Sequence, residues 1–261
     1  MTDRLHHVLG DASFSLVPVP PCTFTMGSPE DELGRHDNEV QREVTLTRPF
    51  AVATTPVTQG LWRAVMGSNP SFFTKGDEAP ERPVETLSWF DAVRFCNALS
   101  LRLGLAPAYV LGAGDEPSVR WERASEGFRL PTEAEWECAA RAGTSHVYAG
   151  GDDLDAVAWH PGNSRLASHP VARKSPNGWG LHDMSGNVRE WCWDRYGRYD
   201  GRRVKDPSGP RDGGDRVLRG GSWYSEPRTA RVASRSFVGP ALLDVDVGLR
   251  VVRTLADGSV A

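Results

Sequence analysis

Three stretches decide how this chain of 261 residues folds, and each combines charged residues with tryptophan. They are Arg129-Leu-Pro-Thr-Glu-Ala-Glu-Trp-Glu137, Asp183-Met-Ser-Gly-Asn-Val-Arg-Glu-Trp191 and Arg216-Val-Leu-Arg-Gly-Gly-Ser-Trp223. The first predicts a helix that begins after Thr132, because Thr132 can cap it and Glu135 completes a capping box. We expect this helix to run to Arg141, before Gly143.

Capping residues predict two further helices earlier in the chain. One covers 59–66, with Thr58 as its cap and Gly67 at its end, and the other runs from Ser88 to Gly104.

Alternating apolar and polar residues indicate one or two strands within 14–27 and a strand over 43–54. Shorter strands are expected at 190–194, 216–223 and 247–254. The polar stretch 28–42 predicts a loop. Residues 144–222 are rich in Gly, Pro and Asp, and we expect ordered coil held by hydrogen bonds, ions and buried tryptophans.

Composition and charge exclude several classes of protein. Lys and Arg number 30 and Asp and Glu 34, and this net charge of −4 argues against nucleic acid as the main partner. No run of apolar residues is long enough for a membrane span. The start of the chain lacks the apolar stretch of a secretory signal, so a cytoplasmic protein is expected. No linker divides the chain, which predicts a single domain over 1–261.

The four cysteines are Cys22, Cys96, Cys138 and Cys192. They form no CxxC pair, and the simplest expectation is that all are reduced core residues.

Residues 195–235 hold eleven Arg or Lys and five Asp or Glu. We expect these arginines to fix coil by bonding backbone carbonyls and by pairing with local Asp. A basic strip could also bind an acidic partner.

The three opening stretches belong to a longer ordered series. Its other members are Phe24-Thr-Met-Gly27, Pro56-Val-Thr-Gln59, Pro83-Val-Glu-Thr-Leu-Ser-Trp-Phe-Asp-Ala92, Ala139-Ala-Arg-Ala-Gly143, Pro176-Asn-Gly-Trp-Gly-Leu181 and Gly248-Leu-Arg250. In this order they resemble the formylglycine-generating-enzyme-like family, also called the sulfatase-modifying-factor family, over about residues 14–254. The resemblance implies an α+β, C-type-lectin-like fold with a small twisted antiparallel sheet, few helices and much ordered coil.

The copper chemistry of that family does not carry over to this chain. In members that oxidise a sulfatase cysteine to formylglycine, two cysteines that bind copper(I) follow the Gly-Gly-Ser-Trp phrase. Here residues 220–235 contain no cysteine, and Ser225 lies near the first thiolate position. We therefore expect no copper, no formylglycine-generating activity and no catalytic residue.

The resemblance also implies one structural calcium site. Its ligands would be Asp183, Gly186, Val188 and Glu190. Two carboxylates and two main-chain carbonyls are the hard oxygen ligands that calcium prefers. The alternative is that Asp183 and Asn187 only hold a turn, while Glu190 pairs with an arginine.

The stretch 223–250 keeps the family's scaffold residues, but the positions between them form an unpatterned mixture. Many relatives are rich in asparagine there. The mixture resembles the variable proteins of diversity-generating retroelements, where randomised adenines turn asparagine codons into many others. The residues expected to contact a ligand are Tyr224, Ser225, Glu226, Arg228, Thr229, Ser234, Ser236, Phe237, Val238, Ala241, Leu242, Leu243, Asp244, Val245 and Asp246.

Three functions stay open at this point. The first is a non-catalytic protein whose residues 223–246, diversified by a retroelement, bind a protein or other macromolecule. The second is an undiversified regulatory or interaction module, in which ordinary drift produced the mixture. The third is a metal-dependent oxidase with an unrecognised site. Exposed apolar side chains at Tyr224, Phe237, Leu242 and Leu243 would favour binding, since such patches mark contact surfaces.

Overall fold

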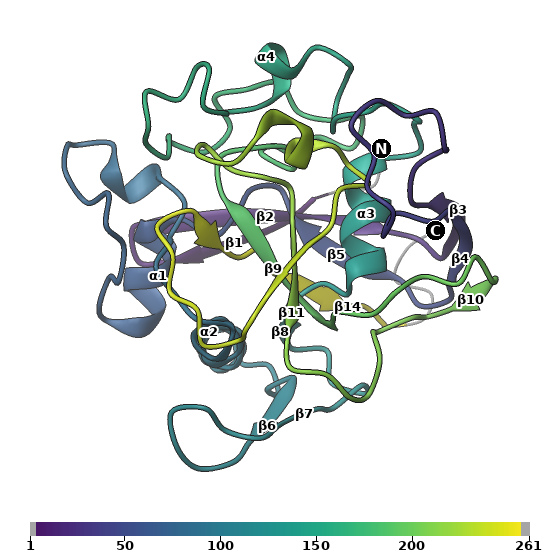
Figure 1. The fold of residues 1–261 in the computed structure, drawn as a ribbon. Helices are drawn as coiled ribbons and strands as arrows, with labels where there is room; N and C mark the ends of the chain where they lie inside the picture. Colours follow the sequence, from purple (N-terminus) through teal and green to yellow (C-terminus); the bar gives the residue numbers. More distant parts are fainter. Residues whose placement is uncertain (1–3, 257–261) are drawn as a thin grey trace.

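β-Sheets supply most of the regular structure in the computed structural model, which describes residues 4–256 (Figure 1). The helices among these residues are α1 (Gln59–Met66), α2 (Trp89–Arg102), α3 (Glu133–Arg141) and α4 (Leu154–Val157), with two 3-10 helices, η1 (Ala79–Glu81) and η2 (Pro227–Ala230). None of the helices within this range combines the length and apolar character that crossing a membrane requires.

The strands form three larger sheets and a separate hairpin. The five-stranded sheet has the order β1 (Leu5–Leu9), β2 (Ala12–Val19), β5 (Phe50–Ala53), β14 (Val252–Thr254) and β8 (Phe128–Arg129). The three-stranded sheet has the order β10 (Val204–Lys205), β4 (Arg42–Leu46) and β3 (Cys22–Met26). The four-stranded sheet has the order β12 (Ser236–Val238), β11 (Arg216–Arg219), β9 (Arg189–Arg195) and β13 (Val247–Gly248). The hairpin pairs β6 (Tyr109–Leu111) with β7 (Val119–Trp121).

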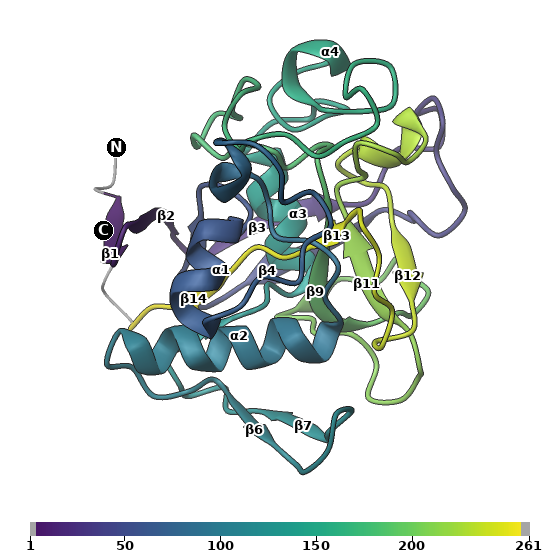
Figure 2. The ribbon, with the colours of Figure 1, turned by 90° about the vertical axis from the view of Figure 1, so that its left-hand side faces the viewer.

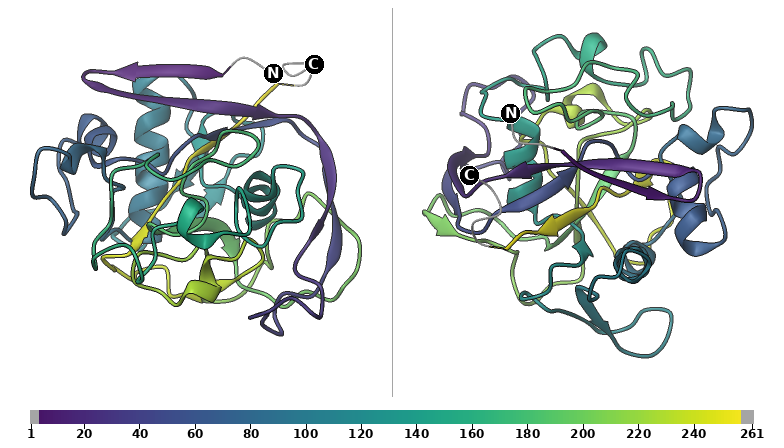
Figure 3. Two further views of the ribbon diagram at one scale, coloured as in Figure 1. Left: turned by 90° about the horizontal axis from the view of Figure 1, so that it is seen from above. Right: turned by 180° about the vertical axis from the view of Figure 1, so that it is seen from behind.

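Most strand pairs are antiparallel, as expected, but β4 with β10 and β9 with β13 are parallel. The β1–β2 hairpin runs across the back of the molecule (Figure 3). On another side, α2 lies between the main body and the β6–β7 hairpin (Figure 2). One apolar core joins α1 and α2 to the five-stranded sheet, and a second surrounds α3.

The three predicted helices are confirmed together with their caps. Thr58 caps α1, which ends at Gly67 in the left-handed conformation (φ 78°). Capping boxes begin the other two, with Ser88 and Asp91 on α2 and Thr132 and Glu135 on α3. These signals are local in the sequence, so they could be interpreted without knowledge of the tertiary structure.

The single strand predicted over 43–54 is wrong. The chain forms β4 and then β5, which belong to different sheets, and all four residues of β5 are buried. The break falls at Thr47, whose backbone N–H donates to Asp206 (2.7 Å), and at Pro49, which has no backbone N–H to donate. Likewise the predicted strand 247–254 is two strands, β13 and β14, in different sheets.

Buried tryptophans fill the space between helices and strands, as the composition predicts. The Trp89 indole on α2 donates to the Cys192 carbonyl on β9 (2.9 Å). In return the Trp191 indole donates to the Leu87 carbonyl (3.1 Å), just before α2. A buried indole N–H requires such a partner, so this reciprocal pair fixes how α2 lies on β9.

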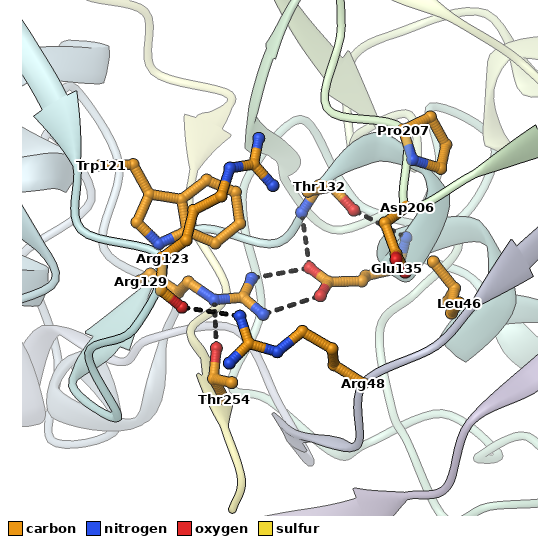
Figure 4. A pocket seen from close by; sticks show the side chains of 10 residues that line it. All are labelled: Leu46, Arg48, Trp121, Arg123, Arg129, Thr132, Glu135, Asp206, Pro207 and Thr254. Carbon is orange, nitrogen blue, oxygen red and sulfur yellow. Dashed lines mark hydrogen bonds and ion pairs between the residues drawn. The ribbon is translucent and has the colours of Figure 1, made fainter.

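The three glutamates of α3 each bind a buried arginine. Figure 4 shows the pair in the first turn of the helix, in which the Arg129 guanidinium donates two hydrogen bonds to the Glu135 carboxylate (2.6 and 2.7 Å). Arg129 also donates to Thr254 Oγ1 on β14 (3.0 Å). The pair therefore ties the capping box of α3 to the five-stranded sheet.

The other two glutamates reach residues much later in the chain. Glu133 accepts two bonds from Arg235 (2.6 and 2.8 Å), and Glu137 accepts from Arg219 and Arg141. The pairs of Glu133 with Arg235 and of Glu137 with Arg219 are buried, and each carboxylate is bound bidentately or shared, which is the geometry that can offset the desolvation of the charges.

Arg219 also organises the coil that follows β11. Its guanidinium donates to the carbonyls of Val232, Ala233 and Ser234 as well as to Glu137. The expectation that such arginines bond backbone carbonyls is confirmed here. The expected pairing with local Asp is wrong for Arg219, Arg231 and Arg235, because their carboxylate partners are glutamates far away in the sequence.

Replacing Arg219 by methionine should lower the free energy of unfolding by about 3–5 kcal/mol, since Glu137 and three carbonyls lose a buried donor. Arg219→Lys should also destabilise, because an ammonium cannot span these acceptors. The exposed Arg173→Met, which breaks pairs with Glu78 and Glu81, is the control and should cost less than about 1 kcal/mol. Urea unfolding measures all three, and equal effects at the two sites would contradict this assignment.

Candidate ligand-binding surface

Residues 223–246, here called the display segment, are held from beneath by a compact set of polar contacts. Asp246 accepts from Ser222 Oγ (2.6 Å) and from the guanidinium of Arg189 on β9 (3.0 Å). The Trp223 indole donates to the Val245 carbonyl (3.3 Å), so the two ends of the segment meet. This anchoring uses Asp246, Ser222, Arg189 and main-chain atoms rather than the exposed side chains of Tyr224 and Leu243.

The structure brings most of the predicted ligand-contacting residues to the surface. The exposed ones are Tyr224, Glu226, Arg228, Phe237, Ala241 and Leu243, and the half-buried ones are Ser225, Thr229, Ser236, Val238, Leu242, Asp244 and Val245. Ser234 and Asp246 lie beneath the surface, each with 3% of its area exposed. Asp246 accepts from Ser222 and Arg189 beneath the segment, while Ser234 also lines the groove beside it.

Large apolar side chains stand out from this surface. Tyr224, Phe237 and Leu243 have 66%, 42% and 58% of their areas exposed. Phe237 lies flat against Tyr196 with ring centroids 3.7 Å apart. Leu242, predicted to be exposed with them, is half-buried and packs against the core.

An aromatic row extends this surface beyond the display segment. Phe72 packs edge-on against Phe73, which packs against Trp223, and Trp223 contacts Tyr224. Glu85 fixes the row by accepting the backbone N–H groups of Phe72 (3.0 Å) and Phe73 (2.9 Å). Sequence reasoning missed Phe72 and Phe73, whose adjacent aromatic rings in a polar loop were the only available signal.

A groove of about 690 Å³ adjoins the display segment, and its second wall was also missed. Residues His36, Asp37 and Asn38 form that wall, facing Arg228 and Phe237. Figure 2 shows this early loop beside η2. Arg231 links the display segment to this loop, because its guanidinium binds Glu39, next to Asn38, through two hydrogen bonds (2.6 and 2.8 Å).

The predicted calcium ligands lie together in one short buried segment. Asp183 Oδ2 accepts from the Ala172 backbone N–H (2.8 Å), and its Oδ1 accepts from Asn187 (3.2 Å). Gly186 has a positive φ (79°), and a Cβ there would lie 2.3 Å from the Trp159 carbonyl oxygen, so only glycine fits.

The fit of this segment to calcium is partial. Burial raises the pKa values of Asp183 and Glu190, and the charge of Asp183 raises that of Glu190 further, so a cation would offset their repulsion. However, Glu190 accepts from Arg250 (2.8 Å) and from the Trp136 indole (2.7 Å). This arrangement is the arginine pairing considered as the alternative to a calcium site. Calcium binding therefore stays a prediction.

The residues between 4 and 256 contain no group of three or more His, Cys, Asp or Glu side chains placed to hold a metal ion. Ser225, which the resemblance places near the first copper-binding thiolate position, accepts from the Ser222 backbone N–H (2.7 Å) and from Thr229 Oγ1 (2.9 Å). The hydroxyl thus closes a turn in the display segment.

Comparison with known proteins agrees with this architecture. The model of the sulfatase-modifying factor enzyme 1-like domain matches residues 12–255. The chain is 35% identical to the chaperone protein LppX of Paenibacillus barcinonensis over 245 residues, 82% of each chain. It is 32% identical to the formylglycine-generating enzyme of Streptomyces coelicolor, covering 94% of this chain and 91% of that one.

Among solved structures, variable protein 1 of Treponema denticola is similar, with a TM-score of 0.91 and 33% identity. That likeness covers 98% of this chain and 100% of the other. The α+β, C-type-lectin-like fold expected from the sequence is confirmed. The chain belongs to the family of the sulfatase-modifying factor enzyme 1-like domain, also described as formylglycine-generating-enzyme-like.

Proposed function

We propose that this protein is a non-catalytic binding protein that contacts another macromolecule through the outer face of the display segment. The proposal rests on the contrast between inward and outward side chains within residues 223–246. Inward residues such as Asp246 are anchored to the scaffold, while Tyr224, Phe237 and Leu243 project outward. Clustered exposed apolar side chains on a rigid base are typical of contact surfaces.

Rigidity favours binding because an ordered surface loses little conformational entropy when a partner docks. Here the backbone is fixed by Arg219, Arg231 and Arg235, whose charges are buried against glutamates. The likeness to a protein named a variable protein supports the view that this surface tolerates substitution. We include in the proposal that a retroelement diversifies these positions.

The undiversified interaction module is the second candidate. It is favoured by the 35% identity to a protein named a chaperone, since such a protein acts on a protein partner. In that case the same outer face would bind one fixed partner. An oxidase is the least supported candidate, because the copper-binding cysteine pair has no counterpart after Gly220, although the family includes formylglycine-generating enzymes.

A photo-crosslinking residue at Tyr224 or Phe237 should capture a partner from a cell extract of the source organism, because both side chains face outward. The matched control is Val110 on β6, which is 47% exposed but lies outside the display segment. We expect a discrete adduct from the two test positions and none from the control.

A crosslinker at Ser236, on β12, should also form an adduct in the otherwise unchanged chain. Alanine at Tyr224, Phe237 and Leu243 together should abolish that adduct, while the variant stays folded with only a small fall in melting temperature, since Phe237 stacks on Tyr196. Exposed side chains outside the core contribute little to stability. Identical adducts from Val110, or unfolding of the triple variant, would contradict the proposal.

Diversification makes a separate prediction about DNA. If a retroelement acts here, the DNA beside the gene should contain a near-copy of the segment that encodes residues 223–250. The copy should differ almost only at adenines and lie beside a reverse transcriptase gene. Sequencing the flanking DNA tests this prediction, and the absence of such a copy would favour the undiversified module.

The calcium proposal predicts that a chelator lowers the melting temperature and that added calcium restores it. At a hundredfold excess over its dissociation constant, a bound ion stabilises the fold by about 2.7 kcal/mol. Asp183→Asn should remove the response to calcium, whereas Asp115→Asn, on an exposed loop, should keep it. A wild-type melting curve that is identical in chelator and in calcium would contradict the site and leave Glu190 as a partner of Arg250 and Trp136.

A further inference from the structure

Two of the four cysteines meet although 116 positions separate them in the sequence. The Sγ atoms of Cys22, at the start of β3, and Cys138, in α3, lie 3.1 Å apart as free thiols. A disulfide bond is about 2 Å long, so a movement of about 1 Å would join them. Cys96 and Cys192 are isolated core residues, as the sequence predicts, and Cys22 is the exception because it is half-buried.

A cavity of about 560 Å³ opens onto this pair. Both cysteines line it, together with Phe24, Arg141 and Trp179. That volume is within the range of pockets that hold small molecules. Cys138 is buried whereas Cys22 is partly exposed, so a reagent in the cavity reaches Cys22 first.

The two thiols differ in pKa. The hydrogen bond from Cys138 lowers the pKa of Cys22, while that bond and burial raise the pKa of Cys138. Cys22 is therefore the thiol suited to attack first. Cys138 is placed to resolve the product by its position, because its Sγ atom lies 3.1 Å from that of Cys22.

Charged side chains of both signs line the cavity. Arg141 lines it and donates to Glu137, which also accepts from Arg219. Glu32, the acid in the cavity wall, pairs with Arg231 (2.5 Å), and Arg231 also binds Glu39. Glutathione disulfide carries both carboxylate and ammonium groups, so Arg141 and Glu32 match its two kinds of charge.

We propose that Cys22 and Cys138 are a redox-active dithiol that small, carboxylate-bearing disulfides oxidise from this cavity. The Cys22 thiolate attacks one sulfur of the small disulfide, forms a mixed disulfide and releases one small thiolate. Cys138 then passes its proton to the released thiolate and attacks the Cys22 sulfur, which releases the second small thiolate. That thiolate takes up the proton that Cys22 had lost. The protein pair loses two electrons and two protons, and the small disulfide is reduced to two thiols.

The test uses the full chain and glutathione disulfide as the probe. After incubation, remaining thiols are alkylated under denaturing conditions and the peptides are identified by mass spectrometry. We expect the wild type to lose about 2 Da and to yield a peptide that links Cys22 to Cys138. Cys138→Ala should stop at one glutathione on Cys22, because no resolving thiol is present.

Two variants complete the test. Cys96→Ala is the matched control, and it should form the same crosslink as the wild type. Cys22→Ala should leave its three remaining thiols unmodified, which keeps the test decisive even if Cys138→Ala does not fold. The proposal is overturned if all four wild-type thiols are alkylated, or if wild type and Cys138→Ala retain glutathione on Cys22 equally.

Discussion

The fold depends on the burial of charge around α3. Glu133 and Glu137 lie about one turn apart on this helix, and their partners Arg235 and Arg219 come from the last quarter of the chain. An unpaired charge in these positions would cost several kcal/mol. Burial of α3 and ordering of the coil from 219 to 235 therefore depend on each other, and these ion pairs order that coil more than regular secondary structure does.

That constraint explains how an irregular surface can be both rigid and tolerant of substitution. Arg219 holds the carbonyls of Val232, Ala233 and Ser234, and main-chain carbonyls are present whatever the side chains are. The side chains of Tyr224 and Leu243 are exposed and do not order the backbone in this way. Substituting them changes what the surface can bind, while the ordering of the backbone has already been achieved by folding.

The sequence predicted what depends on neighbours in the chain and missed what depends on distant ones. Thr132 and Glu135 cap α3 within one turn, so that helix could be placed to the residue. The break between β4 and β5 involves Asp206, 159 positions from Thr47, which no local pattern reveals. The same holds for the candidate site: family motifs located the display segment, but the groove wall at 36–38 arises only from tertiary packing.

The thiol pair and the ion pairs act on the same junction. Cys138 follows Glu137 directly, and Glu137 already accepts the backbone N–H of Gly27, just after β3 (2.8 Å). Arg141 donates to the Gly27 carbonyl (2.7 Å), so β3 and α3 are joined by hydrogen bonds before any oxidation. A disulfide between Cys22 and Cys138 would add a covalent link to a contact that exists, and would need little movement of α3. Oxidation should then alter the stability of this junction more than the shape of the surface that α3 supports.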